Sequence, residues 1–326
     1  MHVKLQQLKY LKAISDNNLN VSAASEALFT TQPGVSKQVL LLEKELGVRI
    51  FERHGKHLQR ITDVGEKILS EVEKMLRLEQ KIKAIAKEHV DPGTGVFNIF
   101  TTHTIARYLL PASVSVFTKR HPKINFNLHP TLPSQAKGGI SRGYSDFSIV
   151  AHDVGADSDL IILPAYLWTL GLVVPEDHPL ASIEKPTLED ISQYPLLTYE
   201  QGASGRERID ETFRNAGLAL NYFMTAMDAD VIKRYVELGF GIGIISSLAA
   251  KDIEHMKLKY IDINHLLEPC QAWICFSKDV ILQNYMYDFL GSFSPHLTKT
   301  LMEEVLMNSN SNRVEAIFKD IKLPVY

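Results

Sequence analysis

A chain of 326 residues is long enough to form two or more domains, each with a core of its own. Hydrophobic residues make up 45% of it and charged residues 22%, which excludes a disordered or fibrous protein. Two cysteines, Cys270 and Cys275, are too few for a disulfide framework or a metal cluster, and no basic leader or membrane-spanning apolar stretch is present. We therefore expect a cytoplasmic protein with no membrane partner and no metal site.

Charge is distributed unevenly along the chain. Residues 1–62 carry nine Lys and Arg against five Asp and Glu, a net charge of +4, although the whole chain has a net charge of -3. A basic N-terminal segment before an acidic remainder is typical of a protein whose first domain meets an anionic partner. A solvated surface also reaches +4, so the charge needs support from motifs.

Two short helices are predicted first. Leu and Ile residues recur at helical spacing between Leu5 and Ile14, and a turn at 16–18 ends that helix. An alanine-rich helix over 22–28 follows, with Asn20 or Ser22 as its N-cap. Its small side chains allow another helix to approach closely.

A third helix begins after a tight connection and ends at Gly47. Thr31 is its predicted N-cap and Pro33 lies in its first turn, where a missing N–H costs nothing. A short helix, a turn and a helix that opens with polar side chains together predict a helix-turn-helix, which reads base edges in the major groove of double-stranded DNA. The residues predicted to face DNA are Thr31, Gln32, Pro33, Ser36 and Lys37.

Residues 49–60 predict a basic hairpin, or wing, with Gly55 at its tip. Arg53 and Lys56 are its predicted contacts to the phosphate backbone. A helix then begins at Thr62 and shows a heptad-like apolar stripe, which predicts pairing with a second copy of itself. Packing against the chain's own next domain is the alternative. The stripe comprises Ile68, Val72, Met75, Glu79, Ile82 and Ala86.

The remainder of the chain has the rhythm of an α/β domain. Residues 89–95 interrupt every period, after which strands are predicted at 96–100, 124–128, 146–151 and 169–174, with helices at 105–121 and 134–142 between them. A second set follows over 195–265, and 271–276 returns as a strand towards the first. We expect two lobes with mostly parallel sheets and a ligand cleft between them.

Two hydroxyl-rich turns are the candidate ligand contacts. Residues 101–104 (Thr-Thr-His-Thr) lie between a strand end and a helix start, and 202–205 (Gly-Ala-Ser-Gly) lead into another helix. Such turns direct hydroxyls and backbone N–H groups at a small anion or carboxylate, although either turn is also an ordinary helix cap. Motifs of serine hydrolases, phosphate-binding loops and zinc peptidases are absent, so we expect neither an enzyme nor a cofactor.

Residues 31–53 (TQPGVSKQVLLLEKELGVRIFER), followed by Leu58, Thr62 and Gly65, closely resemble the winged helix of LysR-type transcriptional regulators. Residues 178–180 (HPL) and 238–246 (LGFGIGIIS) resemble the effector-domain signatures of that family, so the resemblance covers the whole chain. It implies a winged helix-turn-helix over 1–61, a dimerisation helix over 62–90 and a two-lobed α/β effector domain of periplasmic-binding-protein type over 91–326.

Further segments resemble the CysB branch of the family, which activates genes of cysteine synthesis and sulfur assimilation. They are residues 101–108 (TTHTIARY), 228–232 (DADVI), 285–289 (YMYDF), 295–298 (PHLT) and 318–324 (FKDIKLP). The resemblance implies a homotetramer, a dimer of dimers, on promoter DNA in contact with RNA polymerase. It also implies an effector such as sulfate, thiosulfate or acetylserine.

The family's effector pocket falls on Thr102, Thr104, Ile105, Ala151, Trp168 and Ser204. Ile105 stands where the branch usually has glutamine and Ala151 where it has threonine, so two hydrogen-bonding side chains are missing. Each donor to a buried anion is worth about 1.5 to 3 kcal/mol. The effector is therefore expected to differ from that of the nearest CysB proteins, and an organosulfur compound such as a sulfonate is the alternative. A solute-binding or enzymatic α/β protein is a distant alternative, which the absence of a secretion signal disfavours.

Overall fold

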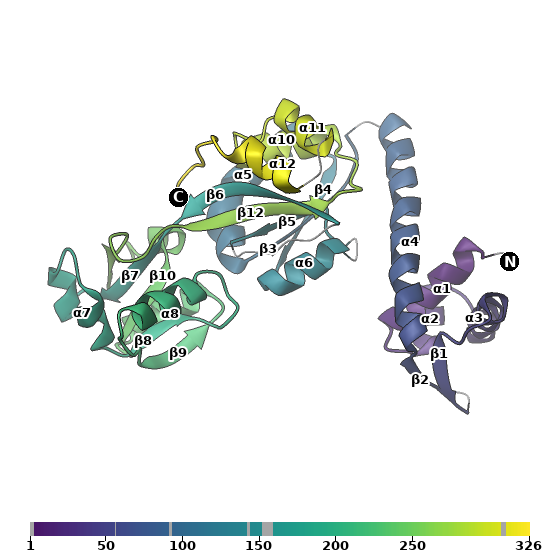
Figure 1. Ribbon diagram of the computed structural model, residues 1–326, viewed down its shortest axis with the longest axis horizontal. Coiled ribbons are helices and arrows are strands. Elements are labelled where there is room, and N and C mark those ends of the chain that lie inside the picture. The colour runs from purple at the N-terminus through teal and green to yellow at the C-terminus, as the bar shows by residue number, and fades with distance from the viewer. Residues whose placement is uncertain (1–2, 56, 91–92, 142–143, 152–158, 308–310) are drawn as a thin grey trace. The chain divides into compact units, whose positions relative to one another are not determined.

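The computed structural model describes residues 3–55, 57–90, 93–141, 144–151, 159–307 and 311–326 (Figure 1). The chain divides into two compact units, Met1–Pro92 (unit 1) and Gly93–Tyr326 (unit 2). Among the described helices, none is both long and apolar enough to cross a lipid bilayer.

Unit 1 is a helical domain with a two-stranded hairpin. Its elements are α1 (Leu5–Asp16), α2 (Val21–Ala27), α3 (Gln32–Leu46), β1 (Phe51–His54), β2 (His57–Ile61) and α4 (Asp63–Val90). The side chain of Asn20 accepts hydrogen bonds from two backbone N–H groups of α2, which decides between the two predicted caps. Thr31 occupies the N-cap position of α3 without a capping hydrogen bond from its side chain, and Gly47 ends α3 in the left-handed conformation (φ 71°).

The core of unit 1 lies where α1 meets α2, α3 and α4. Leu8, Leu11 and Ile14 form the buried stripe of α1, and Val35 and Val39 form that of α3. The first turns of α4 join this core through Leu69 and Val72. These contacts confirm the three predicted helices and explain their spacing, since only residues three and four apart face the same side of a helix.

The apolar stripe of α4 divides into two parts. Val72 is only 3% exposed and belongs to the core of unit 1, whereas Met75 and Ile82 are 49% and 68% exposed. Glu79, the exception within the stripe, forms an ion pair with Lys9 of α1 at 3.0 Å. The charged residue therefore faces α1, and the exposed apolar surface begins after Val72.

Unit 2 contains two five-stranded sheets, which define two lobes. Lobe I has the strand order β4-β3-β5-β12-β6 and lobe II the order β11-β7-β10-β8-β9. The strands of lobe I are β3 (Gly95–Thr101), β4 (Ile124–Pro130), β5 (Phe147–Val150), β6 (Leu160–Trp168) and β12 (Cys270–Ser277). Those of lobe II are β7 (Leu170–Pro175), β8 (Leu196–Tyr199), β9 (Tyr222–Ala226), β10 (Ile242–Ser246) and β11 (Leu258–Asp262).

Both sheets are mixed, which corrects the expectation of mostly parallel ones. In lobe I, β3 pairs in parallel with β4 and β5, but β12 runs antiparallel to β5 and β6. Lobe II repeats this pattern, with β7 antiparallel to β10 and β11. The reason is that the chain crosses between lobes at Thr169 and again before β12, so each lobe receives strands that return in the opposite direction.

Helices cover both faces of the sheet in lobe I. In Figure 1, α5 and α10 lie on one side and α6 on the other. The longer helices of unit 2 are α5 (Leu110–Arg120), α6 (Pro133–Ser141), α8 (Arg206–Asn215), α9 (Ala229–Glu237), α10 (Asn284–Phe293), α11 (Lys299–Met307) and α12 (Ser311–Phe318). Shorter helices are α7 (Leu188–Ser192), η2 (Pro179–Ser182) and η3 (Ser247–Asp252).

Two local features differ from the predicted elements. The expected helix over 105–121 opens with a π-helical turn, η1 (Ile105–Leu109), before α5 begins. Strand β6 was absent from the predicted strands, although it is the longest of lobe I. Its residues 160–168 read as a nearly continuous apolar run without strict alternation, because both faces of this strand are buried.

Candidate functional site

A small cavity between lobes I and II brings together all six predicted effector contacts. Its volume is about 40 Å³. A water molecule needs at least about 10–15 Å³ by the same measure, so the cavity suits a molecule of a few heavy atoms. The residues lining it are Thr102, His103, Thr104, Ile105, Thr131, Leu132, Ala151, Tyr166, Trp168, Tyr199, Ala203, Ser204, Met227, Ser246 and Leu248.

Strand ends place the predicted residues. Thr102 follows the carboxyl end of β3, and Ala151 follows that of the parallel neighbour β5. Such ends meet at one edge of a sheet, where α/β proteins bind ligands. Trp168 ends β6, and Ser204 lies in the turn before α8 of lobe II.

Three buried hydrogen-bond donors of the cavity are unsatisfied. Among the described residues, the Tyr166 hydroxyl, the Trp168 indole N–H and the Ser204 hydroxyl have no hydrogen-bond partner. Buried polar groups are nearly always paired, because leaving one unpaired costs about 1–3 kcal/mol. Three such groups around one cavity indicate a site that accepts a hydrogen-bonding ligand.

The cavity offers donors without a fixed charge. In the described part of the chain, no Lys, Arg, Asp or Glu lines it. Tyr199 is buried, and burial raises its pKa to about 12, despite hydrogen bonds from the Ser246 backbone N–H and with Thr104. Burial also raises the pKa of Tyr166 far above its usual value. Both phenols therefore stay protonated at neutral pH and available as donors.

Arg206 stabilises the turn that contains Ser204. It is buried, and its guanidinium donates to the Tyr199 carbonyl at 2.8 Å and to the Asp210 carboxylate at 3.0 Å. The same guanidinium lies over the ring of Tyr222, 4.0 Å from its centroid. These contacts connect the first residue of α8 to the end of β8, so they hold two cavity-lining segments in register.

The two departures from the CysB pattern form part of the apolar wall. Ile105 and Ala151 are both buried and both line the cavity. Neither side chain can donate or accept a hydrogen bond. Leu132, Met227 and Leu248 extend this wall. The cavity is therefore amphipathic, with hydroxyl and indole donors beside apolar side chains.

Several residues that line the cavity, including Tyr166 and Tyr199, were not among the predicted contacts. Tyr166 stands two residues before Trp168 on β6, and side chains two apart in a strand point to the same face. Recognition of this strand would have placed both aromatic residues together. Tyr199 and Ser246 come from separate strands of lobe II, and no local pattern in the sequence connects them.

The predicted DNA-reading residues lie at the N-cap and on the first two turns of α3. Thr31, Gln32, Pro33 and Lys37 are exposed, and Ser36 is half-buried. The side-chain amide of Gln32 lies 3.4 Å from the Ser36 hydroxyl. The buried stripe of α3 occupies the opposite face of the helix, so these polar groups are presented to solvent.

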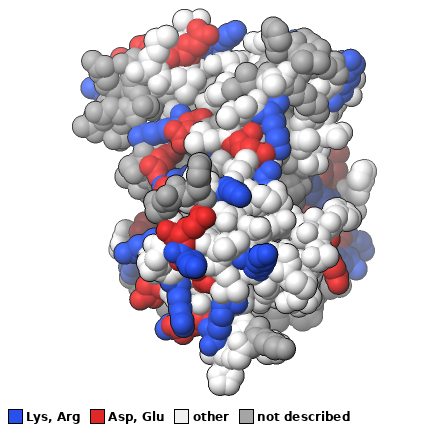
Figure 2. Space-filling model, turned by 90° about the vertical axis from the view of Figure 1, so that its right-hand side faces the viewer, with Lys and Arg blue, Asp and Glu red and all other residues white. Residues whose placement is uncertain are grey.

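The wing residues differ in their surroundings. Arg53 forms an ion pair with Glu43 at 3.2 Å. The Glu43 carboxylate also accepts hydrogen bonds from the backbone N–H groups of Ile50 and Phe51. Arg53 thus fastens the hairpin to α3, and its predicted contact with phosphate stays a prediction. Lys56 lies outside the described residues. Figure 2, whose lower end shows the hairpin, displays Lys and Arg side chains interspersed with Asp and Glu.

Phe29 is an exposed aromatic residue that the sequence patterns did not single out. It lies between α2 and α3, is 99% exposed and adopts a positive φ of 50°. A bulky residue in that conformation is strained. The solvent-exposed ring of Phe29, next to the N-terminal end of α3, therefore adds an apolar side chain to this surface.

Comparison with known proteins identifies the family. Residues 91–297 match the LysR substrate binding domain, and residues 5–66 match the bacterial regulatory helix-turn-helix protein of the lysR family. The chain belongs to the LysR family of transcriptional regulators. Unit 1 therefore contains the family's DNA-binding helix-turn-helix, and the cavity lies within its effector-binding domain.

Whole-length relatives place this regulator in the CysB branch. It is 42% identical to the HTH-type transcriptional regulator CysB of Haemophilus influenzae over 98% of this chain and 99% of that protein. It is 37% identical to the regulator SsuR of Burkholderia cenocepacia over 91% and 96% of the two chains. The solved cofactor-binding domain of the Cbl transcriptional regulator covers 66% of this chain and 94% of its own, with 34% identity and a TM-score of 0.63.

Proposed function

We propose that this LysR-family protein is a cytoplasmic regulator, chiefly an activator, of genes for cysteine synthesis and sulfur assimilation, controlled by a small sulfur-linked anion. Two observations support the proposal. Its relatives CysB, Cbl and SsuR align along most of the chain. Its cavity carries three unpartnered donors, which suit the oxygens of a small oxyanion. In this proposal the protein has no catalytic role and needs no cofactor.

The domain division we propose is a winged DNA-binding domain over 1–61, a dimerisation helix over 62–90 and an effector domain over 91–326. The residues that contact base edges in the major groove, or the phosphates beside it, are Thr31, Gln32, Pro33, Ser36 and Lys37. In this proposal Arg53 and Lys56 contact the phosphate backbone. The exposed positions on α3 support base contacts by Gln32 and a phosphate contact by Lys37.

The effector we propose is an oxyanion in which one oxygen is replaced by sulfur or a short apolar group. The predicted polar contacts donate hydrogen bonds to its oxygens, and they are Thr102, Thr104, Trp168 and Ser204. Ile105 and Ala151 contact the substituent that needs no hydrogen bond. Thiosulfate and methanesulfonate have this chemistry, and the small cavity volume favours them over acetylserine. This effector class also fits the alternative that the protein regulates the use of sulfonates, as a paralogue of CysB.

A tetramer, a dimer of dimers that contacts RNA polymerase on promoter DNA, completes the proposal. Met75, Leu78 and Ile82 form an exposed apolar stripe on α4 that suits pairing with the same helix of a second copy. Lobe II carries a second exposed patch, in which the rings of Phe223 and Phe240 stack at 5.4 Å beside Tyr235. Two separate apolar surfaces are what a dimer of dimers requires.

Retardation of sulfur-gene promoter fragments in a gel tests the regulator proposal, with excess competitor DNA and the salt concentration stated. We expect the full-length chain to bind such fragments and a chain without residues 1–90 not to bind them. Equal binding by both would contradict the proposal and would favour a solute-binding role for the two-lobed domain.

A further inference from the structure

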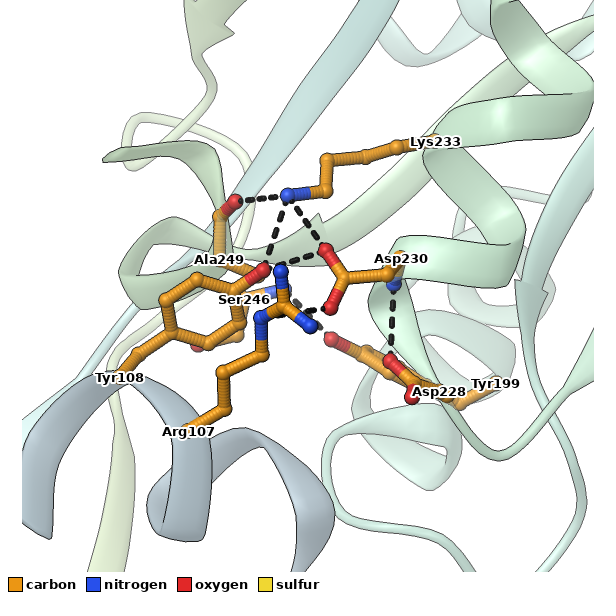
Figure 3. Close-up of polar contacts among 8 residues, drawn as sticks. All are labelled: Arg107, Tyr108, Tyr199, Asp228, Asp230, Lys233, Ser246 and Ala249. Carbon is orange, nitrogen blue, oxygen red and sulfur yellow. Dashed lines mark hydrogen bonds and ion pairs between the residues drawn. The ribbon is translucent and has the colours of Figure 1, made fainter. Parts of the chain in front are cut away.

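A group of four residues connects the two lobes beside the cavity (Figure 3). Arg107 and Tyr108 come from η1 of lobe I, whereas Asp230 and Lys233 come from α9 of lobe II. The Tyr108 hydroxyl donates to Oδ1 of Asp230, and Nζ of Lys233 donates to the Tyr108 oxygen at 2.9 Å. Nε of Arg107 lies 2.9 Å from Oδ2 of Asp230. We call Tyr108, Asp230 and Lys233 the interlobe cluster, and Arg107 is its exposed neighbour.

Lys233 is a buried cation whose partners come from both lobes. Its side chain is only 2% exposed. Its ammonium group lies 2.7 Å from the Asp230 carboxylate and donates to the Ala249 carbonyl and the Tyr108 hydroxyl, each at 2.9 Å. An ammonium group has three N–H donors, so all three are used. Separation of the lobes would remove the Tyr108 oxygen, and an incompletely paired buried charge is costly.

The protonation states match these hydrogen bonds. Burial, with a further contribution from Asp230, raises the pKa of Tyr108 well above its usual value. Burial alone would raise the pKa of Asp230, but hydrogen bonds from Lys233 and Tyr108 hold it below its usual value. At neutral pH Tyr108 is therefore a neutral hydroxyl and Asp230 a carboxylate. Hydrogen bonds of this charge-assisted kind are the strong ones.

The interlobe cluster adjoins the cavity on both sides. Ile105 lines the cavity, and Tyr108 stands three residues later in the same π-helical turn, a structure that is rare and frequent at functional sites. On lobe II, the cavity-lining Leu248 immediately precedes Ala249. A change in the spacing of the lobes at the cavity would therefore move Tyr108 relative to its partners on lobe II.

We propose that the interlobe cluster, through the Tyr108 hydroxyl, holds the lobes in the arrangement that binds effector, and so sets effector affinity without touching the effector. Tyr108, Asp230 and Lys233 are thus positioning residues. The inference rests on the proposed effector role of the cavity. It assigns a function to segments 101–108 and 228–232, both of which the sequence resemblance singled out.

Tyr108→Phe tests this inference with little disturbance. The ring, whose centroid lies 5.1 Å from Nζ of Lys233, is retained, and only the interlobe hydroxyl is removed. Arg107→Gln is the matched control, because the Arg107 side chain is 58% exposed and exposed ion pairs contribute little. Ser204→Ala changes the cavity without changing the interlobe cluster. Asp230→Asn, alone and combined with Tyr108→Phe, completes a double-mutant cycle.

Two measurements on the full-length chain are needed. Titration calorimetry with sulfate and with thiosulfate gives Kd, and hydrogen exchange without either anion reports local opening of residues 105–109 and 229–237. We expect Tyr108→Phe to raise Kd about tenfold and to speed exchange in both segments by a similar factor, with less than about a twofold change for Arg107→Gln. We expect Asp230→Asn to be the more damaging single variant, because it also removes the ion pair with Lys233. We expect the double variant to lose less affinity than the sum of the two single losses, because both substitutions remove the hydrogen bond between Tyr108 and Asp230.

The outcomes separate the interlobe cluster from the cavity. Unchanged Kd and unchanged exchange in Tyr108→Phe, with weaker binding by Ser204→Ala, would overturn the inference and leave the proposed function standing. Additive effects in the cycle would overturn the coupling of Tyr108 to Asp230. If the wild type binds neither anion, the proposed effector is wrong, and so is the proposed control of its affinity by the interlobe cluster. The hydrogen-exchange result then decides only whether the interlobe cluster holds the two lobes together.

Discussion

Gly205 of lobe II lies directly against the ring of Trp168, which ends β6 of lobe I. A Cβ atom at Gly205 would lie 2.8 Å from Cη2 of Trp168, closer than real contacts of this kind, and the backbone there has a φ of +85°. The absence of a side chain at Gly205 thus allows the indole and the Ser204 hydroxyl to border one cavity.

Gly205→Ala is expected to weaken anion binding at least about tenfold, because the added methyl displaces the Trp168 indole from its position as a donor. Gly202→Ala is the matched control. Gly202 has a similar φ of +79° but nothing within 4 Å of its Cβ position, so it shares the backbone strain without the collision. Calorimetric titration of both variants with thiosulfate measures the difference, and equal losses would show that strain alone is responsible.

Ile105→Gln with Ala151→Thr is expected to raise sulfate affinity at least about tenfold, because each added polar group can hydrogen-bond a buried anion. The same double variant is expected to lose preference for methanesulfonate over sulfate. Competition titrations on the full-length chain measure both constants. Tight sulfate binding by the wild type, unimproved by the substitutions, would show that the existing hydroxyl, indole and backbone donors suffice.

Gln32→Ala is expected to reduce discrimination between operator and scrambled DNA by about 1–3 kcal/mol, as loss of a base contact does. Lys37→Ala is expected to weaken binding to both and to lower the salt slope by about one. Arg53→Ala is also expected to weaken both, but it breaks the ion pair with Glu43, so its fold must be checked by circular dichroism. Fluorescence anisotropy at several salt concentrations measures these effects, with exposed Lys185→Ala in lobe II as control. Binding curves for Gln32→Ala that match the wild type would remove this residue from the base-reading set.

Met75→Glu with Ile82→Glu is expected to reduce the molecular mass in solution, because it places four charges in the seam of each α4 pair. Val72 is unsuitable for this test, since it belongs to the core of unit 1 and its substitution would unfold that unit. Ser70→Glu with Gln80→Glu, on the opposite face of α4, is the control. Light scattering measures the mass, and an unchanged value for the seam variant would refute pairing through α4.

Features that depend on neighbouring residues could be predicted from the amino-acid sequence. Caps and apolar spacing located the helices of unit 1, because a helix end is decided within a few residues of Asn20 or Gly47. The hydroxyl turns at 101–104 and 202–205 were recognisable for the same reason. Family resemblance added Ile105, Ala151 and Trp168, and the structure brings all of the predicted effector contacts to one cavity.

Features that depend on segments far apart in the sequence became visible in the folded chain alone. Strand β6 pairs with β12, more than a hundred residues later, so neither its existence nor the place of Tyr166 followed from local pattern. Tyr108 and Asp230 are 122 residues apart in the sequence. In the sequence, Lys233 cannot be distinguished from the solvent-exposed charged residues of an amphipathic helix. Its burial depends on the packing of η3 against η1 of the other lobe and on the hydrogen bond with Tyr108, and both join segments that are far apart in the sequence.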